Sequence, residues 1–317
     1  MKTIIEIKKD YLRDMDLYPL SLGQEGETTN PQPDKCNNFN YRKNDGSPTY
    51  LMQHYTFVDF NETIKIFTTN ESLSAHYVIT SDGTIQEFVA PQYRAYHAGP
   101  GNLSIGSKLN PNLASNIIKD DLNSWSIGIE NVNNGNEEFT PEQIEANVLL
   151  CEHLCNMYSS LNPKLMLSHA DWLYDKIDPG PYFPYELLAN SSEKYEVTRN
   201  FGIYPRKAEL QLKQKPEEVL SYKEQAARED IEHYQSLLRE YGYDIDEEEN
   251  GVLGTKTLQA VLAYNLHFNG PEILNDELKK QAWNDLWCNF SNYETRMLLS
   301  QLTENDVKCL ADILDQY

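Results

Sequence analysis

Four short runs of apolar and β-branched residues, separated by turn-forming residues, constrain the fold of this chain most strongly. They lie at residues 50–56, 75–80, 84–89 and 124–130, and a Ser-Asp-Gly turn at 81–83 separates the second run from the third. Runs of this length bounded by such residues are typical of β-strands. At Thr140 a helix is expected to begin, with Thr140 as N-cap and Pro141 in the first helical position. The pattern predicts an α/β fold, a mixed central sheet flanked by helices.

The rest of the chain divides into an N-terminal arm and a C-terminal helical part. Residues 1–49 are expected to form an irregular arm, because residues 20–47 are rich in Asn, Gly, Pro, Thr and Gln and carry no apolar period. Residues 50–205 are assigned to the α/β domain. Beyond a polar stretch at 213–218, apolar positions recur only with helical spacing, over about 221–241, 255–268 and on to 314. Residues 206–317 are therefore expected to form a small all-α domain.

The charge of the chain excludes one class of partner. Its 49 Asp and Glu residues outnumber 27 Lys and Arg, which gives a formal net charge of −22 and repels nucleic-acid phosphates and anionic membranes. A transmembrane helix needs about 18 consecutive apolar residues, and the sequence holds no such run. Residues 1–10 also lack the apolar stretch of a signal peptide. We expect no nucleic-acid partner, no membrane span and no export signal, and no protein partner is implied.

The cysteines indicate neither a disulfide framework nor a zinc ribbon. There are five of them, an odd number, and no two are spaced as Cys-x-x-Cys. Cys151 and Cys155 lie one helical turn apart in an apolar-periodic segment, so we interpret them as packed thiols. Because the sequence also lacks a Gly-x-Ser-x-Gly motif, a serine or cysteine hydrolase is disfavoured.

Two histidines and one aspartate could form a metal site, although they are distant in sequence. His54 lies in the first apolar run, His169 ends a later one, and Asp178 follows nine residues after His169. Imidazole nitrogens and a carboxylate oxygen suit Zn²⁺, and three protein ligands leave a fourth position for water. Taken alone, His54 is more commonly a structural histidine, and the spacing does not by itself establish a site.

Two further charged residues are candidates for catalysis. Strand alternation places Glu130 on the same face as Ser126 and Gly128. A glutamate ending a core strand is costly to bury without a partner or a role, and general base is one such role; a side chain that reaches solvent is the alternative. Lys176 lies two residues before Asp178, so a cation beside the metal is one interpretation and an exposed pair in a Pro/Gly turn is the other.

Six ordered blocks resemble the zinc-dependent N-acetylmuramoyl-L-alanine amidases of the Amidase_2 type, whose fold is shared with peptidoglycan recognition proteins. The blocks, which cover about residues 50–190, are 53–56, 73–78, 82–85, 94–99, 126–131 and 168–181. The segments 237–244 and 251–268 are similar to the helical peptidoglycan-binding-like domain that follows the amidase domain in some members. A generic helical accessory domain is the alternative for this second part.

The resemblance implies one Zn²⁺ per chain, held by His54, His169 and Asp178. It assigns Glu130 as the catalytic acid/base and Lys176 as the cation near the developing oxyanion. The implied reaction is hydrolysis of the amide between N-acetylmuramic acid and L-alanine in peptidoglycan or muropeptides. A cell-envelope location is implied as well, which conflicts with the missing export signal.

The resemblance also implies residues that bind substrate: His76, His97, Tyr96 and Arg94, of which the two histidines would line the groove or support the metal ligands. Tyr96 departs from the family, which usually has Trp there. Two alternative functions remain open, a non-catalytic peptidoglycan-recognition protein and a cytosolic amidase that recycles anhydro-muropeptides. The presence of all three metal ligands favours an enzyme.

Overall fold

The computed structural model describes residues 38–43, 47–69, 72–101, 121–173, 175–203, 228–288, 293–301 and 304–316. Most of the expected N-terminal arm, residues 1–37 and 44–46, lies outside these ranges. The described residues form two compact units. One holds those between 38 and 99, 121 and 167, and 190 and 202; the other holds 100–101, those between 168 and 189, and those from 203 onward.

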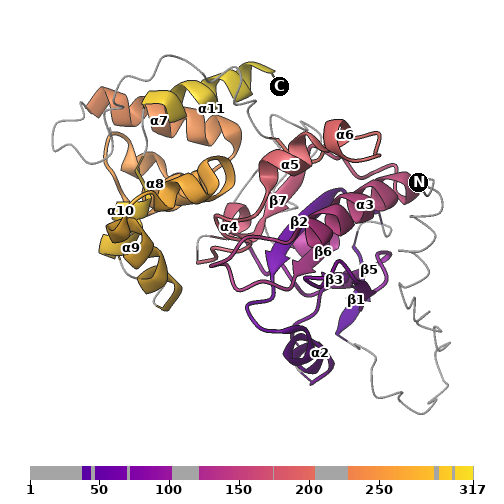
Figure 1. The fold of residues 1–317 in the computed structure, drawn as a ribbon. Helices are drawn as coiled ribbons and strands as arrows, with labels where there is room; N and C mark the ends of the chain where they lie inside the picture. Colours follow the sequence, from indigo (N-terminus) through magenta and orange to yellow (C-terminus); the bar gives the residue numbers. More distant parts are fainter. Residues whose placement is uncertain are drawn as a thin grey trace, which may run out of the picture. The chain divides into compact units, whose positions relative to one another are not determined.

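A five-stranded mixed sheet forms the centre of the first unit (Figure 1). Its strands β2 (Tyr50–Tyr55), β3 (Tyr77–Ile79) and β6 (Ser126–Asn131) run parallel, with β6 between the other two. Strand β4 (Ile85–Glu87) pairs antiparallel with β3 at one edge, and β7 (Met166–Ser168) lies beyond β2 at the other. The four expected strands and the mixed α/β class are thereby confirmed.

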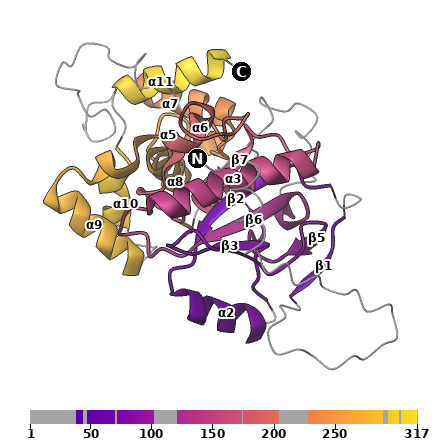
Figure 2. The same ribbon diagram turned by 45° about the vertical axis from the view of Figure 1, so that its right-hand side comes forward.

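Helix α3 (Pro141–Met157) lies across the face of this sheet, as Figure 2 shows. It begins where the sequence predicts, because the hydroxyl of Thr140 accepts a hydrogen bond from the backbone N–H of Gln143 at 3.1 Å. The side-chain amide of Gln143 in turn donates to the carbonyl of Ile79 on β3 at 3.0 Å. The first turn of the helix is thus fixed both to its own N-cap and to the sheet.

A buried trio of amides ties the middle of α3 to the two central strands. Asn147 exchanges hydrogen bonds of 2.9 and 3.0 Å with Gln53 on β2 and donates at 3.0 Å to the side-chain oxygen of Asn131 on β6. Asn131 donates at 2.9 Å to the backbone carbonyl of His54. Because all three amides are satisfied, the network costs little to bury and holds the backbone of β2 in place.

A second, two-stranded sheet corrects the expectation of an irregular arm. Residues Phe39–Tyr41 form β1 and pair antiparallel with β5 (Tyr93–Ala95). The rings of Phe39 and Tyr41 contact the ring of Tyr93, with centroids 5.0 and 5.9 Å apart. Three residues carry too little pattern to predict such a strand, whose stability comes from distant partners. Helix α2 (Phe60–Thr69) packs nearby through Phe67.

The second unit is helical, as expected for the C-terminal part. It contains the short helices α4 (His169–Trp172) and α5 (Tyr185–Ala189), whereas α6 (Ser191–Lys194) belongs to the first unit. The longer helices are α7 (Arg228–Tyr241), α8 (Thr255–Tyr264), α9 (Glu277–Cys288), α10 (Tyr293–Leu299) and α11 (Glu304–Gln316). A π-helical turn, Asn265–Asn269, and a 3₁₀ turn, Gly270–Leu274, follow α8 directly.

The segment 168–189 is part of the core of this helical unit, although the sequence pattern grouped it with the α/β domain. Its residues Ala170 and Ile177 are buried in one hydrophobic cluster with Leu262, Leu266 and Trp283. The compact units therefore do not divide at the expected position between residues 205 and 206. Among the helices described above, none has the length and apolar character required to span a membrane.

Candidate metal centre

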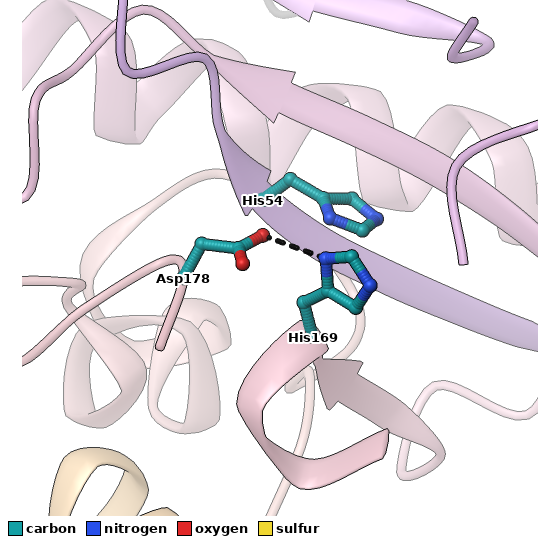
Figure 3. A group of neighbouring side chains, drawn as sticks. All are labelled: His54, His169 and Asp178. Atoms are coloured by element: carbon teal, nitrogen blue, oxygen red, sulfur yellow. Dashed lines mark hydrogen bonds and ion pairs between the residues drawn. The ribbon is translucent and has the colours of Figure 1, made fainter. Parts of the chain in front are cut away.

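Three side chains that are far apart in sequence converge in the structure. His54 comes from β2, His169 is the first residue of α4, and Asp178 follows in the loop after that helix. One ligand atom from each residue lies within 4.8 Å of the other two, and all three side chains are buried (Figure 3). Two imidazoles and one carboxylate form a donor set of the kind that holds Zn²⁺ with one position open. The residues present are therefore suited to holding a metal ion.

Local hydrogen bonds fix the turn that carries His169. Ser168 is the N-cap of α4 and forms a reciprocal capping box with Asp171, whose backbone N–H donates to the Ser168 hydroxyl at 2.9 Å. The backbone N–H of Ala170 donates to the carbonyl of Asp178 at 3.0 Å, and Nδ1 of His169 lies 3.1 Å from a carboxylate oxygen of Asp178. The two candidate ligands of this segment are thus held together through backbone and side chain.

Glu130 lies directly beside His54 on the sheet. The two residues are register partners in the parallel pairing of β2 and β6, so their side chains leave the same face. Ile127 and Ile129, which point to the opposite face, are fully buried, while Glu130 remains half-buried. The alternation expected from the sequence is confirmed, and it places a carboxylate next to a candidate metal ligand.

His97 orients the imidazole of His54. Its Nδ1 lies 3.0 Å from Nε2 of His54, and its Nε2 lies 3.3 Å from the hydroxyl of Ser126. Because that hydroxyl donates to the carbonyl of Leu122 at 2.8 Å, it accepts from His97, whose Nδ1 then accepts from His54. This order of protons makes Nδ1 the atom of His54 that presents a lone pair to a metal.

A glycine and an asparagine make room for His97 and hold it. A Cβ on Gly128 would lie only 2.5 Å from Cγ of His97, so the ring can cross β6 only where the strand has no side chain. The side-chain oxygen of Asn123 accepts the backbone N–H groups of His97 and Ala98 at 2.9 and 2.7 Å. Sequence reasoning missed Asn123, because an asparagine ahead of a strand has many ordinary roles.

His76 does not have the position of a residue that binds substrate. Its side chain is 0% exposed; Nδ1 accepts from the backbone N–H of Gly128 at 2.9 Å, and Nε2 lies 3.0 Å from the carbonyl of Tyr93 and 2.9 Å from Nη2 of Arg42. Burial, and then the neighbouring Arg42 guanidinium, lowers the pKa of His76 well below its usual value, so the ring is neutral. A direct substrate contact is incompatible with this burial, and His76 instead supports the packing behind His97.

Arg94 and Tyr96, which precede His97 in the sequence, lie close together. Nε of Arg94 donates to a carboxylate oxygen of Asp121 at 2.7 Å, and the guanidinium carbon lies 5.2 Å from the centroid of the Tyr96 ring. Arg42, which the sequence placed in the irregular arm, is buried and donates to the carbonyls of Pro91 and Asn123 at 2.9 and 3.0 Å. Both arginines therefore help to build the loop that carries His97.

The remaining candidates differ in exposure. Lys176 is exposed, two residues before the buried Asp178. Cys151 and Cys155 are buried on α3, and burial raises the pKa of the Cys155 thiol to about 11, which opposes a thiolate nucleophile there. The expected packed thiols are confirmed.

The mixed sheet and the buried cluster of two histidines and one aspartate define a class of α/β proteins with a site suited to a metal ion. Within that class, residues 44–181 match the family described as N-acetylmuramoyl-L-alanine amidase. The ordered blocks of the sequence lie largely within this match, so the resemblance to N-acetylmuramoyl-L-alanine amidases and the enzyme class that it implies are confirmed.

Curated relatives agree with this similarity, and two solved structures share the fold. AmiD of Escherichia coli strain K12 is 26% identical over 244 residues, which cover 72% of this chain and 76% of AmiD. The 1,6-anhydro-N-acetylmuramyl-L-alanine amidase AmpD of Haemophilus influenzae is 29% identical over 120 residues, 38% of this chain and 58% of AmpD. The structure of E. coli AmiD with anhydro-N-acetylmuramic acid-L-Ala-D-γ-Glu-L-Lys superposes with a TM-score of 0.59 at 20% identity and covers 93% of this chain and 97% of AmiD. AmpDh3 of Pseudomonas aeruginosa gives 0.54 at 22% identity, with 93% and 99% covered.

Proposed function

We propose that this protein is a zinc-dependent amidase that hydrolyses the bond between N-acetylmuramic acid and L-alanine in muropeptides. One observation carries the proposal: His54, His169 and Asp178 form a buried donor cluster, and Glu130 is the register partner of His54. Similarity to the amidase family indicates the bond that is cleaved, and the cluster would supply the chemistry.

His54, His169 and Asp178 would hold one Zn²⁺, since two neutral imidazoles and one carboxylate are ligands that this ion prefers. When bound, the ion supplies Lewis-acid polarisation of the scissile carbonyl and makes a water molecule more acidic. His97 keeps the ring of His54 in the orientation that directs Nδ1 toward the ion, through the 3.0 Å hydrogen bond to Nε2.

Glu130 would accept the proton of the attacking water and pass it to the leaving amine of L-alanine. Its carboxylate is half-buried on the face that carries His54, so it is close to the cluster without being one of its three ligands. Proton transfer by a positioned carboxylate of this kind contributes roughly 10²–10⁴-fold to a rate.

Lys176 is proposed as the cation that faces the developing oxyanion. Its side chain is exposed beside the buried Asp178, where its ammonium could meet a bound substrate. A group that stabilises the oxyanion contributes on the order of a few kcal/mol to lowering the barrier. Tyr96 and Arg94 are proposed to contact the substrate near His97, with the Arg94 guanidinium already oriented by Asp121.

Anhydro-muropeptides are the proposed substrate class. AmpD of H. influenzae is described as acting on a 1,6-anhydro-N-acetylmuramyl compound, and the structures of AmiD and AmpDh3 hold anhydromuramic peptides. Intact peptidoglycan contains the same amide, so the two substrates have to be compared directly on this protein.

The test combines metal analysis with product analysis. Protein purified without chelator is expected to contain about one zinc per chain, to lose activity when the metal is removed and to regain it with Zn²⁺. Mass spectrometry should show a soluble anhydro-muropeptide converted to a free stem peptide with a new L-alanine amino group, and digests of intact peptidoglycan would show whether polymer is also cleaved. Binding of the muropeptide without cleavage by zinc-loaded protein would instead identify a receptor.

A further inference from the structure

Asp171 is a buried, heavily hydrogen-bonded carboxylate two residues after the candidate ligand His169. It is 1% exposed and accepts four hydrogen bonds. Two come from Ser168, from its backbone N–H at 3.1 Å and from its hydroxyl at 2.7 Å. The other two come from distant parts of the sequence, from the hydroxyl of Tyr243 at 2.9 Å and from Nδ1 of His267 at 2.9 Å. The proposed mechanism uses none of these three donors.

Hydrogen bonds and ring stacking together fix the position of the His267 side chain. Its Nε2 lies 3.1 Å from the carbonyl of Ile203, and its ring stacks on Tyr185 and Phe268 with centroids 4.1 and 4.3 Å apart, both at 16°. A carboxylate and a carbonyl are both hydrogen-bond acceptors, so each ring nitrogen of His267 faces an acceptor. The ring of His267 therefore bridges the carboxylate of Asp171 and the carbonyl of Ile203, and all three residues are buried.

The Asp171 carboxylate caps the short helix α4, which carries the candidate ligand His169. Asp171 and Ser168 form the capping box of α4, and His169 is the first residue of that helix. The backbone N–H of Ala170 then donates to the carbonyl of Asp178. A rotation of the Asp171 carboxylate would loosen the start of α4 and, with it, the relative position of His169 and Asp178.

The 3₁₀ turn that directly follows the π-helical turn of His267 begins at Gly270, which lies against the loop after α4. A Cβ on Gly270 would be 3.0 Å from the carbonyl of Pro181, and Gly270 has a φ of +52°, so the close approach needs a glycine. π-helical turns of this kind are frequent at functional positions. Packing and polar contacts therefore both join the segment around α4 to the turns that follow α8, within the helical unit.

We propose that Tyr243 and His267 are positioning residues for the metal ligands His169 and Asp178, and that they act through Asp171. The helical region that follows the amidase domain is then part of the metal-binding apparatus, in addition to any contact that it makes with the cell wall. The physical reason is preorganisation: partners outside the ligand set orient the ligands before the ion arrives, and removing such a partner typically costs 10–100-fold in metal affinity. The inference rests on the metal site of the proposed function.

The test compares two identical chemical changes. Tyr243→Phe removes the hydroxyl that contacts Asp171, whereas Tyr264→Phe removes a buried hydroxyl that lies 3.2 Å from the carbonyl of Asp306 in the same helical region. The dissociation constant for Zn²⁺ is measured by competition with a chromogenic chelator, and the absorption spectrum of the Co²⁺-loaded protein is recorded. Tyr243→Phe should weaken zinc binding roughly tenfold and alter the cobalt spectrum, while Tyr264→Phe should leave both at parental values.

A second variant keeps the test decisive. His267→Phe preserves the stacking on Tyr185 and Phe268 but removes both hydrogen bonds, and it should weaken zinc binding at least as much as Tyr243→Phe. Thermal unfolding of the metal-free proteins shows that each variant is folded; should His267→Phe fail to fold, Tyr243→Phe alone decides. Parental zinc affinity in Tyr243→Phe, or an equal loss in Tyr264→Phe, overturns the inference. A parent protein that binds no zinc overturns the proposed metal site itself.

Discussion

Glu130 and His54 are register partners on two adjacent parallel strands, β6 and β2. Their side chains leave the same face of the sheet, and the opposite face is covered by α3 through the amides of Gln53 and Asn147. The carboxylate and the imidazole are therefore neighbours because of strand pairing, which is among the most rigid relationships that a protein fold offers. The chemistry of the site rests on this pairing.

Glu130→Gln should retain the metal and lose most of the activity. The amide keeps the size of the side chain but cannot accept a proton, so kcat for muropeptide cleavage should fall by roughly 10²–10⁴-fold. Zinc content by atomic absorption should match that of the parent protein. Normal turnover in this variant would contradict the role of Glu130, and loss of zinc would indicate that the carboxylate helps to hold the ion.

Gly128→Ala should displace His97. The new Cβ would lie 2.5 Å from Cγ of that ring, which breaks the hydrogen bond to His54 or shifts β6. Overpacking of this kind costs about 1–3 kcal/mol of unfolding free energy, and zinc affinity should fall as well. Ile129→Val, on the opposite face, is the control: it should cost about 0.5–1.5 kcal/mol and leave zinc affinity unchanged. Equal zinc affinity in the two variants would argue against a role of His97 in orienting His54.

Asn147→Ala should destabilise the protein, because two buried amide side chains each lose a hydrogen-bond partner. Gln53 and Asn131 are buried and would each lose a partner at about 3 Å. An unsatisfied buried polar group costs about 1–3 kcal/mol, and the change also leaves a small cavity under α3. Urea unfolding at neutral pH measures the difference in unfolding free energy. A loss below about 0.5 kcal/mol, half the lower bound of that range, would show that the network contributes little.

Asp121 should make the free energy of unfolding depend on pH in the acidic range. Burial alone would raise the pKa of its carboxyl, but hydrogen bonds from Lys43, Ser124 and Arg94 outweigh burial and hold the pKa below its ordinary value of 3.8. A carboxylate whose pKa is lower in the folded state contributes stability that is present at neutral pH and is lost as the pH falls below about 4. Asp121→Asn should therefore be less stable than the parent at pH 7, and the difference should shrink at pH 3. An equal difference at the two pH values would rule out this carboxylate as the source.

Much of the fold could be predicted because its signals are local. Apolar runs bounded by turn residues marked β2, β3, β4 and β6, and Thr140 with Pro141 marked the start of α3. The three candidate ligands could be named because each lies in a block that resembles the amidase family, and the structure brings them together.

What could not be predicted depends on distant partners. Strand β1 is three residues long and is held by β5 and by the ring of Tyr93. Asn123 is notable only because it binds the backbone of His97, 26 residues away. The bond between His267 and Asp171 joins residues 96 positions apart, and no local pattern announces such a contact. The compact units differ from the expected domains for the same reason. The composition of the sequence changes near residue 213, whereas residues from 168 to 189 already pack with the helical unit.

The capping box of α4 limits how the C-terminal helices could be exchanged between this protein and similar amidases. A hybrid that replaces the C-terminal helices and is joined near residue 205 would separate Asp171 from both Tyr243 and His267. It would also set foreign side chains against the buried Ala170 and Ile177. Such an exchange should transfer residues 168–181 together with the residues after 203. These segments include His169 and Asp178, two of the three candidate metal ligands.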